Sequence, residues 1–104
     1  MKKYLLGIDV GMSACKAGVF DFAGRCAAHS FVSYEAAYPG AGRAEIDPGK
    51  WYRAVCRALA ELFASGRVKK GEIAAIGVDG VSWCAAPVDK GGGILADTPL
   101  WMDT

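Results

Sequence analysis

A carboxylate, a turn of small residues and a lysine follow one another near the start of the chain. Asp9 ends an apolar run, Gly11 and Ser13 come next, and Lys16 lies close behind. Gly11 permits a positive φ and a close approach of the backbone to a ligand, and successive N–H groups of such a turn can bind an anion. Lys16 offers a point charge for phosphate, and Asp9 offers the carboxylate oxygen that Mg²⁺ prefers. The pattern therefore indicates half of a metal and phosphate site.

The same short pattern also has a purely structural interpretation. Asp-x-Gly after a strand is typical of an ordinary hairpin turn, and Lys16 is then simply solvated. The segment is not a Walker A loop, because G-x-x-x-x-G-K-[ST] is absent, and it is not a Rossmann fingerprint, because G-x-G-x-x-G is absent. From the local pattern alone, phosphate binding and a plain turn are both open.

The elements that must hold these residues begin with a three-stranded meander. Apolar runs predict strands over residues 4–9, 15–21 and 25–34, and the residues of 21–24 are those of a type I turn. Connections this short make the three strands antiparallel. The segment 35–46, which contains proline and glycine, predicts an irregular loop.

A helix is predicted after this loop, with shorter strands behind it. Asp47 is a good N-cap, Pro48 suits the first helical position, and Gly66 is expected to end the helix. The apolar stripe of the helix consists of Trp51, Val55, Ala58, Leu59, Leu62 and Phe63. The strands predicted after the helix cover residues 73–78, 83–88 and 100–102, with a turn over 89–93.

The composition is that of one compact domain. The chain has 104 residues, of which 53% are apolar and 22% charged. A net charge of +1 with scattered Lys and Arg gives no electrostatic footprint for nucleic acid or a membrane surface. No run suits a membrane span or a cleaved signal peptide, so we expect a cytoplasmic protein. The four cysteines lie far apart without a zinc pattern, and we expect them to stay reduced and pack as small hydrophobic residues.

The order of elements resembles the opening of the ribonuclease-H-like α/β fold of the actin, hexokinase and Hsp70 superfamily, here a βββαβ portion with a mixed sheet. Within that superfamily the chain resembles the FGGY carbohydrate kinases, which include xylulokinases and glycerol kinases, over nearly its whole length. The matching motifs are, in order, Gly7 to Gly11 with Ser13 and Lys16, Phe20-Asp21 and Gly24-Arg25, Ala44 to Pro48 with Trp51, Ile73 to Val78, Pro87 to Asp89, and Pro99 to Asp103.

This resemblance implies an enzyme that transfers a phosphate from ATP, with Mg²⁺, to a hydroxyl of a small sugar or polyol. It implies that Asp9 faces Mg²⁺ and the ATP phosphates. The residues implied to form the first phosphate-binding loop are Gly11, Met12, Ser13 and Lys16. The residues implied to bind the substrate are Gly80, Val81, Ser82, Trp83, Trp101 and Asp103.

Two departures from the family pattern limit what the resemblance implies. Met12 stands where the family usually has Thr, so this position offers the phosphate only its backbone N–H. The segment 81–84 matches neither the xylulokinase nor the glycerol kinase pattern, so neither substrate is implied. Trp83 either stacks on a sugar or fills the core. We assign Trp51 to the core, and His29 to the surface or the core.

We expect the chain to be the N-terminal part of the first kinase domain, without the second domain. The resemblance puts the catalytic base, a second phosphate loop and the adenosine pocket beyond Thr104, so the chain alone is expected to be inactive. An apolar patch around Tyr4, Leu6, Ile76 and Val78 is expected on the uncovered sheet face, and with it a homodimer. The alternatives are a non-catalytic actin-like binding module and another ATPase of the same superfamily.

Overall fold

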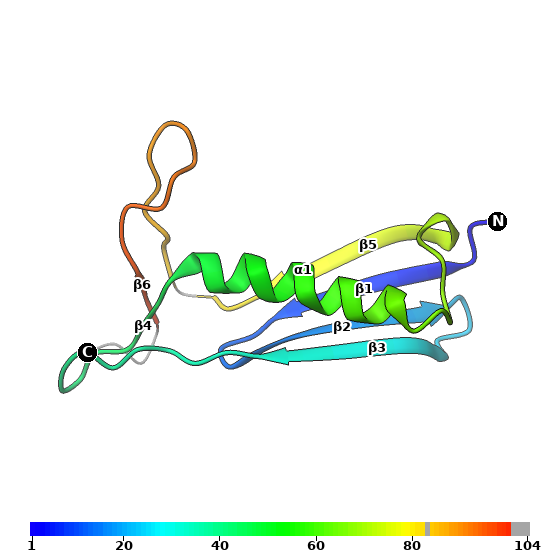
Figure 1. The fold of residues 1–104 in the computed structure, drawn as a ribbon, viewed down its shortest axis with the longest axis horizontal. Helices are drawn as coiled ribbons and strands as arrows, with labels where there is room; N and C mark the ends of the chain where they lie inside the picture. Colours follow the sequence, from blue (N-terminus) through cyan, green and yellow to red (C-terminus); the bar gives the residue numbers. More distant parts are fainter. Residues whose placement is uncertain (83, 101–104) are drawn as a thin grey trace.

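A four-stranded sheet forms the centre of the structure (Figure 1). The computed structural model describes residues 1–82 and 84–100. The sheet has the order β3-β2-β1-β5, and its strands are β1 (Tyr4–Val10), β2 (Ala14–Asp21), β3 (Cys26–Ser33) and β5 (Ile73–Gly80). The first three strands form an antiparallel meander, whereas β5 runs parallel to β1. The predicted meander and the mixed sheet are therefore confirmed.

The helix α1 (Pro48–Ala64) begins and ends where its residues predict. The N-cap is Asp47, whose Oδ1 accepts the N–H of Gly49 at 2.9 Å. At the other end, the N–H of Gly66 donates to the carbonyl oxygen of Phe63 at 3.2 Å. Gly66 has a φ of 76°, a left-handed conformation that favours glycine.

No helix in the described part of the chain is long and apolar enough to cross a membrane.

The helix α1 covers one face of the sheet and packs mainly against β2 and β3 (Figure 1). Alternate residues of the strands meet the apolar stripe of the helix in one core. A hydrogen bond of 2.6 Å from Ser30 Oγ to the carbonyl oxygen of Ala58 joins β3 to α1. The buried residues of this core are Leu6, Ile8, Cys15, Ala17, Val19, Ala28, Ala54, Ala58, Leu62 and Val68.

A smaller unit lies near the N-terminal end of α1. It consists of β4 (Glu45–Ile46), which pairs antiparallel with β6 (Thr98–Pro99). Outside this unit, the 3-10 helix η1 (Lys70–Glu72) leads into β5. A second buried cluster forms in the smaller unit from Ala44, Ile46 and Leu100. Among the described residues, Tyr34 alone packs against both this cluster and the main core.

One of the strands predicted after β5 is wrong, and another lies mostly outside the described residues. The described residues 84–88 form no strand, and only an isolated bridge joins Val88 to Ile94. A strand needs a neighbour for its backbone hydrogen bonds, and Pro87 has no N–H to donate. The last strand within the described residues is β6 at Thr98–Pro99, and Leu100 after it belongs to no strand. The rest of the strand predicted over 100–102 lies outside the described residues.

The expected apolar patch of Tyr4, Leu6, Ile76 and Val78 does not form on the uncovered face of the sheet. Leu6 is buried under α1, and Tyr4 packs against the same core. Side chains alternate along a strand, so a shift of one position brings Leu5 to the uncovered face instead. Ile76 and Val78 are exposed, by 60% and 67%, but not on the uncovered face. They pair with the buried Leu6 and Ile8 and so lie on the α1 side of β5, which stays open because α1 packs mainly against β2 and β3.

Candidate functional site

The turn between β1 and β2 is a tight loop over residues 11–13. The N–H of Gly11 donates to the carbonyl oxygen of Ala14 at 2.9 Å, which closes the turn. A Cβ at Gly11 would lie 3.1 Å from that oxygen, so glycine suits this close approach. A positive φ is not the reason, since the positive φ values among the described residues belong to other glycines. Met12 and Ser13 line a cavity of about 540 Å³ beside the turn.

Tyr34, which follows β3, contacts both sides of this turn. Its backbone N–H donates to the carbonyl oxygen of Ser13 at 3.0 Å, and its hydroxyl donates to the carbonyl oxygen of Gly11. Burial, with smaller contributions from Cys15 and Asp9, raises the pKa of Tyr34 to about 12. The hydroxyl is therefore a protonated donor at neutral pH. Sequence reasoning missed this residue, since Gly11 lies 23 positions away and no local motif joins them.

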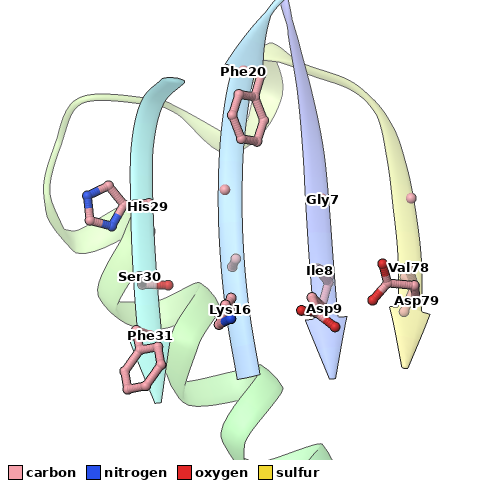
Figure 2. A pocket seen from close by; sticks show the side chains of 13 residues that line it. Gly7, Ile8, Asp9, Lys16, Phe20, His29, Ser30, Phe31, Val78 and Asp79 are labelled. Atoms are coloured by element: carbon pink, nitrogen blue, oxygen red, sulfur yellow. The ribbon is translucent and has the colours of Figure 1, made fainter. Parts of the chain in front are cut away.

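Three charged residues lie in one row on the uncovered face, at the end where β1 and β5 finish (Figure 2). The strand register pairs Asp9 with Lys16 on β2 and with Asp79 on β5. Hydrogen bonding with Asp9, and then repulsion by its charge, raise the pKa of Asp79. Within the described residues, no ion pair involves any of the three.

Asp79 is a second residue that the sequence analysis missed. It reaches Asp9 only because β1 and β5 pair in parallel and end together. The signal in the sequence is an acidic residue at the carboxyl end of the strand that follows the crossover helix, where ligands often bind in open α/β sheets.

A cavity of about 840 Å³ lies over the uncovered face, and the charged row of Asp9, Lys16 and Asp79 lines one part of it. Its floor is a row of three glycines on neighbouring strands, in which Gly7 pairs with Gly18 and with Gly77. Phe20 and His29 line the cavity farther from β5 (Figure 2). Because Gly7 and Gly77 carry no side chains, the backbone of β1 and β5 is open to the cavity there, whereas the ring of Phe20 lies over Gly18.

A further cavity, of about 360 Å³, is lined by Val10, Trp51 and residues 78–81. It therefore contains Gly80 and Val81, two of the residues expected to bind substrate. Ser82, the next expected residue, is exposed. The remaining expected substrate residues, Trp83, Trp101 and Asp103, lie outside the described residues.

The site thus offers carboxylate oxygen atoms for a metal ion and an ammonium group for an anionic ligand. The described residues contain no group of three or more His, Cys, Asp or Glu that could hold a metal ion. Two carboxylates are nevertheless enough for Mg²⁺, which is usually bound through one or two carboxylates together with substrate phosphates. Asp9 and Asp79 supply two carboxylates, and Lys16 supplies the positive charge next to them.

Comparison with known proteins gives consistent matches. The model of the FGGY family of carbohydrate kinases, N-terminal domain, matches residues 4–104. The chain is 32% identical over 101 residues to a xylulose kinase of Staphylococcus xylosus, covering 97% of this chain and 20% of that protein. It is 35% identical over 81 residues to a glycerol kinase of Petrotoga mobilis, covering 75% of this chain and 16% of that protein.

The solved structures agree with the sequence matches. The crystal structure of a xyloylose kinase from Brucella ovis superposes with a TM-score of 0.91 at 30% identity, covering 97% of this chain and 21% of that one. The predicted α/β fold of the actin and hexokinase type is therefore confirmed. The Staphylococcus xylosus and Brucella ovis relatives match nearly the whole of this chain, but the chain spans only about a fifth of their length.

Proposed function

The chain belongs to the FGGY family of carbohydrate kinases, and from this premise we propose a function for the protein that contains it. We propose that the protein transfers the γ-phosphate of ATP to a hydroxyl of a small sugar or polyol. Residues 1–104 then form the N-terminal part of its first domain. The observation that carries this proposal is the position of Asp9 at the end of β1, next to the 11–13 turn and paired with Lys16.

On this proposal, the turn over 11–13 and Lys16 bind the phosphates of ATP. Backbone N–H groups and an ammonium group are complementary to phosphate oxygen atoms. No described residue forms an ion pair with Lys16, so its charge is available to a phosphate. Met12 carries no hydroxyl, and the turn therefore binds the phosphates there through its backbone.

Asp9 is the residue that would hold Mg²⁺, and Asp79 adds a second carboxylate from the neighbouring strand. When bound, Mg²⁺ supplies positive charge that stabilises the phosphate in transfer. Without a cation, two adjacent carboxylates would repel the triphosphate. The donor set of the site therefore supports a metal-dependent nucleotide site.

The sugar or polyol is proposed to bind beyond the ends of β1 and β5. The cavity of about 360 Å³ lies there, and Gly80 and Val81 line it. Its apolar walls, with Trp51 among them, suit the C–H groups of a small sugar. The roles of Trp83, Trp101 and Asp103 in substrate binding stay predictions from the family resemblance.

The test is Asp9→Asn in the full-length protein. We expect kcat for ATP-dependent phosphorylation of a xylulose or glycerol substrate to fall about a hundredfold or more, the size of effect seen when one charge-stabilising group is removed from an active site. The affinity for the sugar, measured by calorimetry, should change little, because the lost interaction is with the metal and phosphates.

The matched control is Asp97→Asn, which removes the same charge from an exposed position outside the site. Its kcat should equal that of the unchanged protein. An Asp9→Asn variant that keeps the full kcat would refute the role of Asp9, and an unchanged protein that phosphorylates no sugar or polyol would refute the proposed function.

A further inference from the structure

We propose that Tyr34 is a positioning residue that holds the 11–13 turn in the conformation that binds nucleotide. The proposal rests on the function proposed above, because it assigns a phosphate-binding role to that turn. Tyr34 does not touch the phosphate in this proposal. It acts through the backbone of Gly11 and Ser13.

Two hydrogen bonds from one residue fix the turn on both of its sides. The hydroxyl of Tyr34 donates to the carbonyl oxygen of Gly11, where the chain enters the turn. The backbone N–H of Tyr34 donates to the carbonyl oxygen of Ser13, where the chain leaves it. A phosphate repels carbonyl oxygen atoms. Holding two of them on Tyr34 prevents the turn from presenting them to the nucleotide.

The position of Tyr34 is itself fixed by packing. Its half-buried ring contacts the main core under α1 and also the second cluster around Ile46 and Leu100. A side chain packed against two clusters has little freedom to move, so its hydroxyl is a fixed reference point for the turn. Because Met12 offers no side-chain hydroxyl, the binding of phosphate depends more strongly on the backbone geometry that Tyr34 sets.

The test is Tyr34→Phe in the full-length protein, which removes the hydroxyl and keeps the packed ring. We expect the Kd for ATP, measured by calorimetry, to rise about tenfold, as for the loss of one hydrogen bond that orients a binding group. The Kd for the sugar and the midpoint of thermal unfolding should stay close to those of the unchanged protein. The matched control is Tyr52→Phe on α1, where the side chain is 72% exposed and far from the turn in sequence.

A second measurement does not depend on activity or on nucleotide. Amide hydrogen exchange of residues 11–14 should become faster in Tyr34→Phe, while the amides of α1 keep their protection. If the protein phosphorylates no sugar but this exchange accelerates, the proposed function fails and the positioning of the turn by Tyr34 stands.

Three results would overturn the positioning role. The first is an unchanged Kd for ATP in Tyr34→Phe, and the second is unchanged exchange at residues 11–14. The third is an equal loss of ATP and sugar affinity together with a lower unfolding midpoint, which would make Tyr34 a packing residue only.

Discussion

Asp9 and Asp79 bring two like charges side by side, because β1 and β5 run parallel and end together. Hydrogen bonding with Asp9, and then repulsion by its charge, disfavour the ionised form of Asp79 and raise the pKa of Asp79. A carboxyl group with a raised pKa in the folded state contributes stability below its pKa in the unfolded chain. That contribution is lost as the pH rises through the raised pKa.

Asp9→Asn should therefore lower the pKa of Asp79 toward its ordinary value. The measurement is a carboxyl-carbon NMR titration of Asp79 in residues 1–104 without metal. Asp97→Asn, which removes an exposed carboxylate elsewhere, should leave the pKa of Asp79 raised. An equally raised pKa in Asp9→Asn would mean that burial or another charge, and not Asp9, causes the shift.

At the scale of single residues, the sequence predicts a part of the site. Asp9, Lys16 and the turn between them lie within eight positions, so their proximity follows from one hairpin. Asp79 and the hydroxyl of Tyr34 join them through strand pairing and packing over long stretches of chain. Such contacts depend on the register of whole strands, which the side-chain pattern of one segment does not fix.

At the scale of the elements, the start of α1 is specified by a few adjacent side chains. Oδ1 of Asp47 accepts the N–H of Gly49, and Oδ2 forms an ion pair with Arg53 at 3.2 Å. The hydrogen bond from Gly49 and then the bond from Arg53 lower the pKa of Asp47. The resulting stability is present above the pKa of an unfolded Asp and is lost as the pH falls through the lowered pKa.

Asp47→Ala should lower the free energy of unfolding by about 1 kcal/mol at neutral pH, the usual effect of losing an N-cap. The measurement is urea unfolding, repeated at about pH 2, below the ordinary pKa of Asp. There the difference between Asp47→Ala and the unchanged chain should shrink. Asp47→Asn keeps a capping oxygen and serves as the control. A difference that stays the same at both pH values would show that the charge of Asp47 contributes nothing.

The sequence predicts elements well where local chemistry determines them. The helix start at Asp47, the helix end at Gly66 and the antiparallel meander follow from caps, turn residues and short connections. The strand predicted over 83–88 does not form in its described part, residues 84–88, because an apolar run does not determine whether a partner strand lies beside it. The turn that follows it forms as predicted, with Asp89 accepting the N–H of Gly91 at 2.9 Å.

At the scale of the whole molecule, one face of the sheet and the edge strand β5 carry exposed apolar residues. Phe31 and Leu5 are 57% and 42% exposed, and Ile76 and Val78 are more exposed still. A sheet covered by a helix on one side normally buries its other face as well. This arrangement favours association in the isolated chain.

Residues 1–104 alone should therefore self-associate and bind a hydrophobic dye. Sedimentation velocity over a range of concentrations measures the association, and Phe31→Ser with Val78→Ser should weaken both association and dye binding. Tyr52→Ser, which changes an exposed aromatic residue on α1, should weaken neither. A monomer at high concentration with a cooperative thermal transition and no dye binding would contradict this prediction.

The family and the overall fold were predicted from ordered motifs along the chain, and both are confirmed. The composition of the exposed patch was predicted only in part. Tyr4 and Leu6, which the sequence analysis expects on the uncovered face, point toward α1. Ile76 and Val78 lie on that same side of the sheet through their pairing with Leu6 and Ile8. A shift of one residue moves every side chain of a strand to the opposite face. In a continuous apolar run such as β1, the sequence does not reveal which alternate residues face the helix.

The row of Gly18, Gly7 and Gly77 sets the stability of the fold against the openness of the cavity floor. Glycine inside a strand destabilises a fold by roughly 0.5–1 kcal/mol relative to alanine. A Cβ at Gly77 would meet nothing within 4 Å, and one at Gly7 would meet only the carbonyl oxygen of Gly18 at 4.0 Å, so internal packing does not require glycine at these two positions. A laboratory selection for heat tolerance would therefore fill Gly7 and Gly77 with larger residues early, and the bare backbone beneath the cavity would be lost with them.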